Sequence, residues 1–417
     1  MKKIQQNLSV SRNAYEIVAG LQENGYEAYI VGGAIRDLLL GRTPKDFDIC
    51  TSATPEEVRS VFGRRHARII GKRFRLVHVY MNGELFEVST FRQEPDAEEQ
   101  EIRKQGKLAD LPEHLIVSDN SFGTAEDDVW RRDFTVNALF FDPVKNEIID
   151  YTDFGIDDIQ NGIVRAIGNP TLRFEEDPVR LLRALKLVAQ YDFTVEAETE
   201  NALFNQMHLI ECAAPSRLSL ELEKILQSIY SDRHLEVFHD YGLLKYFLPE
   251  IDRRWGTGHI EYMLDMLYER NCRVDEGHYR NSISIALAIL AIPFLEADGG
   301  NEPGTLWEPH PDNNVIIEDT VIKAVKPLNM MIRMRVSAER ILKILPDLVF
   351  GNTNKRSQLL QNRSYPHARE IGIIHSCVTC KSSKEFESLW PFRSESAFSG
   401  NRNSNNNKSS HKKKRSQ

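Results

Sequence analysis

Two carboxylates separated by one residue, Asp46 and Asp48, are the first candidates for chemistry in this sequence. The run from Phe47 to Cys50 predicts a short β-strand, and residues two apart on a strand point to the same face. Two neighbouring carboxylates repel each other unless a cation lies between them. Oxygen ligands of this kind suit Mg²⁺, which shares its coordination shell with water and substrate phosphates. An exposed surface pair without a metal is the alternative interpretation.

A glycine pair, Gly32 and Gly33, separates a predicted strand at 29–31 from a predicted helix at 34–40. Glycine lets the backbone approach a phosphate closely, and a helix N-terminus attracts anions. Arg36, one helical turn further on, is placed to add a cationic contact to the same phosphate. A tight turn followed by a surface arginine is the simpler alternative.

Glu87 is a third candidate acid, on a predicted hairpin at 76–91. Asn82 and Gly83 at its centre are the strongest short signal for a hairpin turn. A two-residue turn at this point pairs Glu87 with His78. A charge inside the otherwise apolar LFEV run indicates either a third metal carboxylate or a charged edge strand.

A glycine turn, paired aspartates and an acid on a neighbouring strand are the groups that two-metal phosphoryl transfer requires. In that chemistry two cations lie about 3.5–4 Å apart and activate an attacking hydroxyl. The sequence has no GxxxxGK[ST] motif, so it gives no support to ATP hydrolysis of the P-loop type. It also has no HExxH motif and no paired CxxC motifs, so a zinc enzyme is not expected.

The charge distribution is uneven. The formal net charge of −8 argues against a nucleic-acid partner, but residues 58–83 contain no acid, and the basic residues there are Arg59, Arg64, Arg65, Arg68, Lys72, Arg73 and Arg75. Residues 401–417 are likewise basic and free of acids. Local positive patches bind phosphates whatever the net charge is. A solvated face and a disordered tail are the alternative.

Length and composition bound the class of protein. A chain of 417 residues exceeds the ~250–300 residues of a single core, so several structural units are expected. The sequence has no run of 18 apolar residues and no apolar signal segment at its start, so neither a membrane span nor secretion is expected. Five cysteines, an odd number, fit a reduced, cytoplasmic setting.

Strand and hairpin signals concentrate in the first 155 residues, and helical periodicity dominates after them. We predict helices at 1–24 and through RRDFTVNAL (131–139), and a hairpin over 140–151. Thr54, Pro55 and Glu57 predict a helix start with a capping box. Gln93 to about Asn120 is charged and aperiodic, which predicts a mobile loop.

The chain resembles a known family in three ordered stretches. YIVGGAIRDLLLGRTPKDFDICTSATPEEV (29–58) resembles the head motif of the class II tRNA nucleotidyltransferase and bacterial poly(A) polymerase family, within the polymerase β-like nucleotidyltransferases. RRDFTVNALFFDP (131–143) is similar to the second motif of the family. Residues 153–190 are similar to its third stretch, which includes an EDxxR motif. The similarity is recognisable from about residue 25 to residue 230.

This resemblance implies a fold class and a division of the chain. We expect an α/β head, a nucleotidyltransferase palm with a mixed sheet and helices, followed by an all-α neck and body and a disordered basic tail. The expected parts are a catalytic head at 1–155, a neck at 156–230 that binds nucleotide and RNA, a body at 231–397 that binds RNA, and a tail at 398–417.

Two activities share these motifs: addition of CCA to tRNA and addition of A-tails to RNA. RIIGKRFRLVHV (68–79) and residues 118–135 are similar to the poly(A) polymerase branch. The resemblance therefore implies template-independent transfer of AMP from ATP to RNA 3′ ends with two Mg²⁺, for which Mn²⁺ can substitute. A CCA-adding enzyme is the first alternative, and a non-catalytic RNA-binding protein on the same scaffold is the second.

The resemblance also implies roles for single residues. Asp46 and Asp48 would hold the metal ions, and Glu87 would complete the catalytic acids. Asp133 and Asn137, four residues apart, would share one face of a helix. Nucleotide contacts are implied for Gly32, Gly33, Arg36, Arg132, Asp133, Asn137, Asp177 and Arg180, and the basic segment supplies candidate RNA contacts at Lys72, Arg73 and Arg75.

The EDPVR segment, from Glu176 to Arg180, also has a physical interpretation of its own. Pro178 suits the first helical position, with Asp177 as the N-cap. Arg180 then lies close enough to offer a planar donor beside an acceptor, which can imitate the hydrogen-bonding edge of a nucleotide. A helix cap with a local ion pair is the alternative.

Overall fold

The computed structural model of this chain describes residues 1–71, 76–93, 121–309 and 313–393. It separates into two compact units, Met1–Ala213 (unit 1) and Ala214–Gln417 (unit 2). Unit 1 combines a sheet with helices and the described part of unit 2 is helical, which confirms the predicted fold class. The predicted four-part division stays a prediction, and the tail from 398 and the loop at 94–120 lie outside the described residues.

Eight strands of the described residues form one mixed sheet in unit 1, in the order β1-β8-β7-β2-β3-β6-β5-β4. β3 and β6 run parallel, and every other neighbouring pair is antiparallel. The strands are β1 (Lys2–Gln5), β2 (Ala28–Val31), β3 (Asp48–Thr51), β4 (Ala67–Ile70), β5 (Leu76–Met81), β6 (Glu84–Thr90), β7 (Phe140–Asp142) and β8 (Glu147–Asp150).

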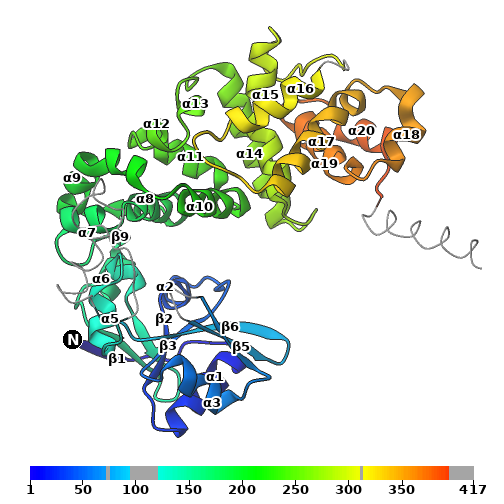
Figure 1. The fold of residues 1–417 in the computed structure, drawn as a ribbon. Coiled ribbons are helices and arrows are strands. Elements are labelled where there is room, and N and C mark those ends of the chain that lie inside the picture. The colour runs from blue at the N-terminus through cyan, green and yellow to red at the C-terminus, as the bar shows by residue number, and fades with distance from the viewer. Residues whose placement is uncertain (72–75, 94–120, 310–312, 394–417) are drawn as a thin grey trace, which may run out of the picture. The chain divides into compact units, whose positions relative to one another are not determined.

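Two amphipathic helices, α1 (Arg12–Glu23) and α3 (Pro55–Phe62), pack on one face of this sheet (Figure 1). Thr54 caps α3 and forms the predicted capping box with Glu57. Part of the opposite face packs on α5 (Ala125–Trp130) through a hydrophobic cluster of Val31, Cys50, Phe91, Ala125, Val129, Ala138, Phe140, Ile149 and Ile167. The sheet therefore has one helix-covered face and one face that is only partly covered.

Local signals in the sequence predicted several elements correctly. The β5–β6 hairpin turns at Asn82 and Gly83, and His78 pairs with Glu87 as expected. β7 and β8 form the second predicted hairpin. The short helix after the glycine pair is α2 (Gly33–Leu39), and Gly41 beyond its end has a φ of 70°, a left-handed conformation that favours glycine.

Two predictions of secondary structure were wrong, and two short strands were not predicted. Lys2–Gln5 is not helical but forms the edge strand β1, because its backbone pairs with β8. RRDFTVNAL (131–139) is not a continuous helix; only the 3₁₀ turn η1 (Thr135–Asn137) forms, and Phe134 instead makes a β-bridge with Ala166. The region after residue 155 also contains two short strands, β9 (Ile163–Val164) and β10 (Thr194–Val195), which pair in parallel.

The rest of unit 1 is helical. Asn169 caps α7 by accepting the backbone N–H of Leu172, and α8 follows with buried residues on most of its length. These elements are α6 (Gly155–Asn161), α7 (Pro170–Glu176), α8 (Val179–Tyr191), α9 (Ala197–Gln206) and the 3₁₀ helix η2 (Met207–Cys212).

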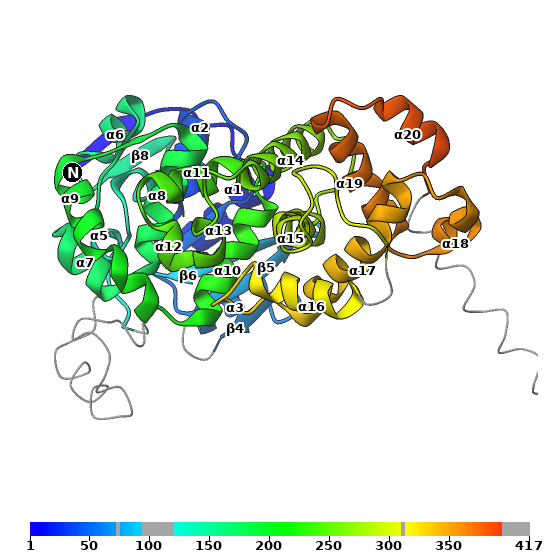
Figure 2. The same ribbon diagram turned by 90° about the horizontal axis from the view of Figure 1, so that it is seen from above.

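Unit 2 is organised around α15 (Ile283–Asp298), which is apolar on all sides and almost entirely buried. Figure 2 shows α14, α16, α17 and α19 grouped around it. The remaining helices are α10 (Pro215–Gln227), α11 (Ser231–Asp240), α12 (Leu244–Phe247), α13 (Pro249–Asp252), α14 (Gly258–Asp275), α16 (Asn313–Lys323), α17 (Ile332–Val349), η3 (Thr353–Lys355), α18 (Arg356–Gln361), α19 (Tyr365–Val378) and α20 (Ser383–Leu389).

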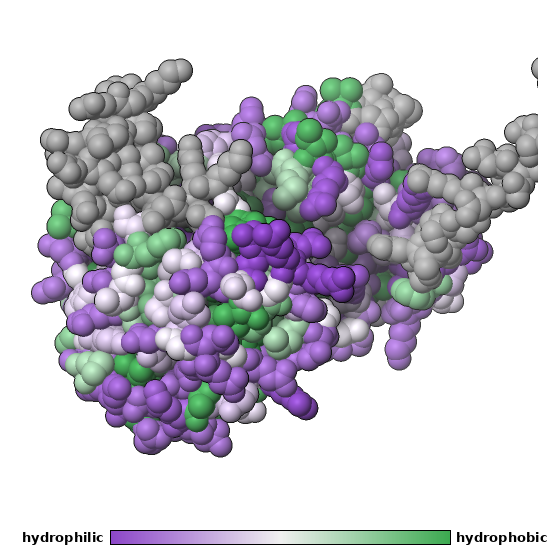
Figure 3. Space-filling view, turned by 60° about the horizontal axis from the view of Figure 1, so that its bottom comes forward, coloured by the Kyte–Doolittle hydropathy of each residue, from purple (hydrophilic) through white to green (hydrophobic). Residues whose placement is uncertain are grey.

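Hydrophilic side chains cover most of the face shown in Figure 3, with small apolar patches between them. Among the described residues, no helix is both long and apolar enough to cross a membrane.

Candidate functional site

The predicted acids gather on the partly covered face of the sheet. β3 begins at Asp48, and its next residue, Ile49, pairs with Val88 of β6, so Asp48 and Glu87 lie in the same row of neighbouring strands. Cys50 Sγ lies 3.0 Å from Ser89 Oγ, which shows that these alternating positions share one face. Asp48 and Glu87 therefore project from the same face, and Glu87 lies on a strand next to that of Asp48, as the sequence predicted.

Asp46 differs from the prediction in one respect. It precedes β3 rather than lying on it, because the strand begins at Asp48 and not at Phe47. Its charge nevertheless acts on Asp48. We refer to Asp46, Asp48 and Glu87, all of which are exposed, as the acidic face.

The acidic face is electrostatically unfavourable on its own. Although Asp48 is exposed, the protein around its carboxyl desolvates it, and the charges of Asp46 and Glu87 add repulsion. Together these effects raise the pKa of Asp48 to about 6, against the opposing influence of Arg132. Carboxylates held together in this way favour either a proton or a cation between them.

The acids do not form a closed metal cage. Within the described parts of the chain, no three His, Cys, Asp or Glu side chains converge closely enough to hold an ion. Glu87 lies 3.7 Å from the His78 imidazole, measured from Oε1 to Nε2. An ion at Asp46 and Asp48 would thus need further oxygen ligands from water or substrate, which is the usual situation for Mg²⁺.

The glycine turn lies directly beside Asp48. Val31, the last residue of β2, pairs with Asp48, and Gly32 follows it with a φ of 75°. A Cβ atom on Gly32 would lie 3.5 Å from Arg132 Nη1, and one on Gly33 would lie 3.2 Å from Arg36 Nη2. The turn is therefore bare backbone with two guanidinium groups packed against it.

Arg36 is buried, and its guanidinium is held on several sides. Nη2 donates to Asp37 Oδ1 at 2.8 Å and to Tyr191 Oη at 2.5 Å, while Nη1 donates to Asn137 Oδ1 at 2.5 Å. The guanidinium also lies over the Tyr191 ring, 4.3 Å from its centroid. Arg36 supports the turn from inside, and its direct contact with a phosphate stays a prediction.

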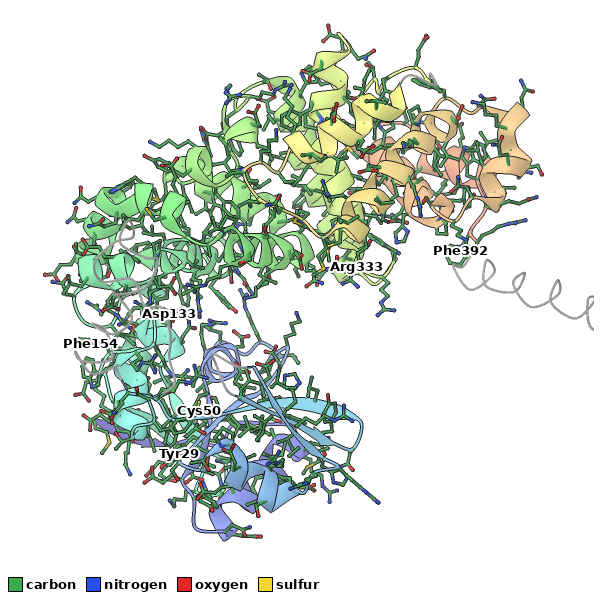
Figure 4. All side chains as sticks on the ribbon, in the orientation of Figure 1. Tyr29, Cys50, Asp133, Phe154, Arg333 and Phe392 are labelled. Atoms are coloured by element: carbon green, nitrogen blue, oxygen red, sulfur yellow. The ribbon has the colours of Figure 1, made fainter. Side chains whose placement is uncertain are left out.

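Arg132 occupies the other side of the turn. It pairs with Asp128 at 2.9 Å, and its Nη1 donates to the backbone oxygen of Asn137 at 3.2 Å. Its Nη2 also contacts Cys50 Sγ at 3.3 Å, on the same face as Asp48. Figure 4 labels Cys50 on this sheet and Asp133, the neighbour of Arg132, above it.

Asp133 and Asn137 meet as predicted, although the helix expected to join them is absent. Asn137 Nδ2 donates to Asp133 Oδ1 at 3.2 Å across the 3₁₀ turn. Burial alone would raise the pKa of Asp133, but the Arg183 guanidinium at 2.7 Å, Asn137 and the Phe134 amide hold that pKa below its ordinary value. This carboxylate is stably charged and internally paired.

The EDPVR segment forms a dense ion-pair cluster. Arg180 Nη1 lies 2.9 Å from Glu176 Oε2 and donates to the Arg173 carbonyl at 2.7 Å. Arg173 also pairs with Glu176, at 2.6 Å. The first helical residue of α8 is Val179, one position later than predicted, but Asp177 accepts its backbone N–H as an N-cap does. The cap and local ion pair of the alternative are thus present, and recognition of a base here stays a prediction.

Several residues that contribute to this site were not predicted from the sequence. Asp128 could have been found, because it lies four residues before Arg132, a spacing that favours ion pairs on a helix. Tyr191 and Arg183 carry no local signal, since Tyr191 meets Arg36 across 155 positions of the chain. The candidate RNA contacts Lys72, Arg73 and Arg75 lie outside the described residues.

Two protein families match this chain. Residues 28–165 match the family described as the poly A polymerase head domain. Residues 192–254 match the family described as a probable RNA and SrmB-binding site of polymerase A. The first match contains both aspartates, Glu87 and the glycine turn.

The curated relatives include enzymes named poly(A) polymerase I and enzymes named CCA-adding enzyme. Poly(A) polymerase I of Haemophilus influenzae is 41% identical over 241 residues, which are 58% of this chain and 52% of the relative. Poly(A) polymerase I of Escherichia coli O157:H7 is 36% identical over 293 residues, 69% of this chain and 61% of the relative. The CCA-adding enzyme of Ligilactobacillus salivarius is 39% identical over 235 residues, 56% and 54% of the two chains. The chain thus spans between about half and three fifths of these relatives.

Solved structures show the same architecture. The CCA-adding enzyme of Bacillus stearothermophilus in complex with CTP is 25% identical, with a TM-score of 0.63 over 91% of this chain and 80% of the other. A tRNA nucleotidyltransferase complexed with a primer tRNA and an incoming ATP analogue is 19% identical, with a TM-score of 0.59 over 89% and 96% of the two chains. The second likeness concerns the fold alone.

Proposed function

Because this chain belongs to the bacterial poly(A) polymerase and class II tRNA nucleotidyltransferase family, we propose that it is a template-independent RNA nucleotidyltransferase that transfers AMP from ATP to RNA 3′ ends. The observation that carries this proposal is the acidic face beside the glycine turn, where the pKa of Asp48 rises to about 6. The acids and the turn are the groups needed to hold a nucleoside triphosphate and a metal ion.

The donor set fits divalent metal. Carboxylates that raise each other's pKa gain most from a hard cation with oxygen preference, and Mg²⁺ binds through one or two carboxylates plus substrate phosphates. Asp46 and Asp48 would hold two Mg²⁺, with Mn²⁺ as a substitute, and Glu87 would complete the acids. When bound, the ions would lower the pKa of the attacking hydroxyl and neutralise charge on the phosphates.

The residues of this chain would orient the reactants. The backbone at Gly32 and Gly33, which carries no side chain, would let a triphosphate approach close to Asp48, and Arg132 at the same turn offers positive charge nearby. Asp133, Asn137, Asp177 and Arg180 are the proposed contacts to sugar and base. The RNA 3′-hydroxyl would attack the α-phosphate of ATP in line, and pyrophosphate would leave.

The preference for ATP over CTP rests on the poly(A) polymerase relatives and on the segments at 68–79 and 118–135. A CCA-adding enzyme is the second candidate, favoured by relatives of that name that are also more than a third identical.

Extension of RNA 3′ ends with single nucleotides would test the proposal. The purified chain is incubated with Mg²⁺, an RNA that lacks its terminal CCA, and ATP or CTP alone. We expect long AMP extension and little CMP, and an Asp48→Ala variant should lose on the order of 10²–10³-fold or more in rate. Strong CMP incorporation would instead identify a CCA-adding enzyme. Failure of every nucleotide with both Mg²⁺ and Mn²⁺ would indicate a non-catalytic RNA-binding protein.

A further inference from the structure

A basic pocket of about 370 Å³ opens on unit 2 between α17 and the segment that joins α18 to α19. Arg340 and Lys343 come from α17, and Arg363 comes from the joining segment. Ile344, Asn362 and Ser364 complete its lining, so none of the described residues that line it is acidic. We refer to this set as the basic pocket.

The cations of the basic pocket differ from others nearby. Arg369 pairs with Glu387 at 3.1 Å, and Lys355 pairs with Asp347 at 3.0 Å. For Arg340, Lys343 and Arg363, by contrast, no side-chain hydrogen bond or ion pair to another residue of the described chain is present. Arg340 and Lys343 are three apart on one helix, so their charges are neighbours and repel, and the nearby acid that both act on, Glu339, is buried outside the lining. A concave site with this charge favours an anion with several oxygens, such as a phosphate.

An exposed aromatic side chain lies on a segment held beside the same pocket. The carbonyl of Pro391 accepts a hydrogen bond from Tyr365 Oη at 2.8 Å, and Arg393 Nη1 donates to the carbonyl of Leu360 at 3.4 Å. Residues 391–393 therefore run alongside 360–365, which contains the pocket residues 362–364. Phe392, between the two anchored residues, is 75% exposed.

The two features lie on one side of unit 2. Figure 4 shows Phe392 and Arg333 at the same side of this unit, and Arg333 precedes Arg340 by seven residues, two turns of α17. A basic pocket beside an exposed ring on an anchored segment combines the two contacts that single-stranded nucleic acid offers: phosphates for the cations and an unstacked base for the ring.

We infer that unit 2 binds single-stranded RNA at this place, with phosphates at Arg340, Lys343 and Arg363 and a base stacked on Phe392. The inference rests on the proposed function in taking RNA as the substrate, and it names a site outside the matched RNA-binding segment at 192–254. Every nucleotide offers the same phosphate to the cations and a flat base to the ring, so the site tolerates any sequence. It would bind the growing RNA strand without recognising its sequence.

RNA binding by the full chain, measured by fluorescence anisotropy at several salt concentrations, tests the pocket. The double variant Arg340→Gln/Lys343→Gln should weaken binding of a labelled single-stranded RNA about tenfold at low salt. It should also reduce the slope of log K against log[salt] by about 1.4, since each phosphate contact on a single strand contributes about 0.7.

The matched control removes the same charge elsewhere. Lys381→Gln/Lys384→Gln lies beyond the other end of α19, whose 14 residues span about 20 Å. This control should keep the wild-type affinity and slope. Equal losses in both double variants, or none in either, would overturn the inference. So would weaker ATP binding by the pocket variant in the absence of RNA, because the pocket would then serve the free nucleotide.

The stacking contact has a separate signature. Phe392→Ala should weaken single-stranded RNA about tenfold without changing the salt slope, and should leave the binding of a duplex unchanged. Tyr268→Ala, which removes another exposed ring (61%) from α14, serves as the control. An equal loss for duplex and single strand, or no loss for the single strand, would contradict a stacked base.

Nucleotide transfer separates this inference from the proposed function. If the wild-type chain binds RNA through the basic pocket but adds no nucleotide, the proposed function is wrong and the RNA site remains supported. If the wild-type chain adds AMP but the Arg340→Gln/Lys343→Gln and Phe392→Ala variants both bind RNA normally, only the RNA site is wrong. With both ideas correct, the pocket variants raise the KM for RNA and leave the rate at saturating RNA unchanged.

Discussion

Two adjoining regions of unit 1 differ in how their charged side chains are paired. On the acidic face, carboxylates lie exposed with like charges around them, and the pKa of Asp48 rises to about 6. In the arginine network behind the glycine turn, Arg36 and Arg132 each pair with an aspartate of the same unit, and Arg173 and Arg180 share the carboxylate of Glu176. Under the proposed function the first region is completed by an external cation, whereas the second is paired within the unit.

The difference in pairing distinguishes the region proposed to bind a ligand, the acidic face, from the region that supports the backbone, the arginine network. A folded chain gains nothing by holding carboxylates together, and a bound cation, as proposed above, would compensate their repulsion. The arginines donate to the backbone carbonyls of Arg131, Arg132, Asn137 and Arg173, and so position the backbone around the turn. Removing an acid should therefore have opposite effects on stability in the two regions.

The largest effect on stability is expected from Glu176→Ala. This change leaves the buried guanidinium groups of Arg173 and Arg180 without their shared carboxylate. Breaking a buried pair from one side costs about 3–5 kcal/mol, and the partial exposure of Glu176 places the expected loss near the lower limit. Urea unfolding gives the value, with Glu175→Ala as the control that should lose less than about 1 kcal/mol. Equal losses in both variants would contradict the cluster.

A smaller loss is expected from Tyr191→Phe. The hydroxyl accepts from Arg36 and donates to Asp37 Oδ1 at 2.7 Å, while the ring lies under the Arg36 guanidinium. Phenylalanine keeps the ring contact and loses the hydroxyl, which should cost about 1–2 kcal/mol of unfolding free energy. Tyr15→Phe, at an exposed position, should change the same urea midpoint very little. An unchanged midpoint for Tyr191→Phe would show that the hydroxyl does not stabilise the turn.

The smallest effect has the opposite sign. The pKa of Asp48 in the folded protein, about 6, lies above its ordinary value of 3.8. Between these two values the folded state binds more protons than the unfolded state. The folded protein therefore loses stability as the pH rises from the lower value to the higher one. Asp48→Asn removes that loss. Since the group is exposed, we expect a gain of about 1 kcal/mol or less at about pH 7.5 and none at about pH 4, measured by urea unfolding without metal. If Asp48→Asn is less stable than wild type at pH 7.5, the claim that the Asp48 carboxylate destabilises the folded protein is wrong.

Local signals explain what could be predicted from the sequence. The turn at Asn82 and Gly83 determined the pairing of Glu87 with His78, and the Thr54–Glu57 capping box marked the start of α3. Both depend on residues close in the chain. Helical propensity failed at 131–139, because a long-range bridge between Phe134 and Ala166 prevails there over local preference.

The candidate site divides in the same way. The acids and glycines were found because their chemistry is visible in a few neighbouring residues. The local ion pair of Glu176 and Arg180 was also among the alternatives, but the distant contacts were not found, because Tyr191 reaches Arg36, and Arg183 reaches Asp133, only after α8 packs against the turn. Sequence reasoning therefore assigned Arg36 to a phosphate, whereas the fold surrounds it with internal partners.

The release of protons on Mg²⁺ binding tests the central claim most directly. Titration calorimetry of the wild-type chain, in buffers of different ionisation enthalpy, counts the protons that leave when the metal binds. Because the pKa of Asp48 rises to about 6, more of this carboxyl is protonated at pH 6 than at pH 8, so we expect measurable proton release on Mg²⁺ binding at pH 6, less at pH 8, and none from Asp48→Asn at either pH. Mg²⁺ binding without proton release at pH 6, or no Mg²⁺ binding at either pH, would contradict an acidic face that exchanges its proton for a metal ion.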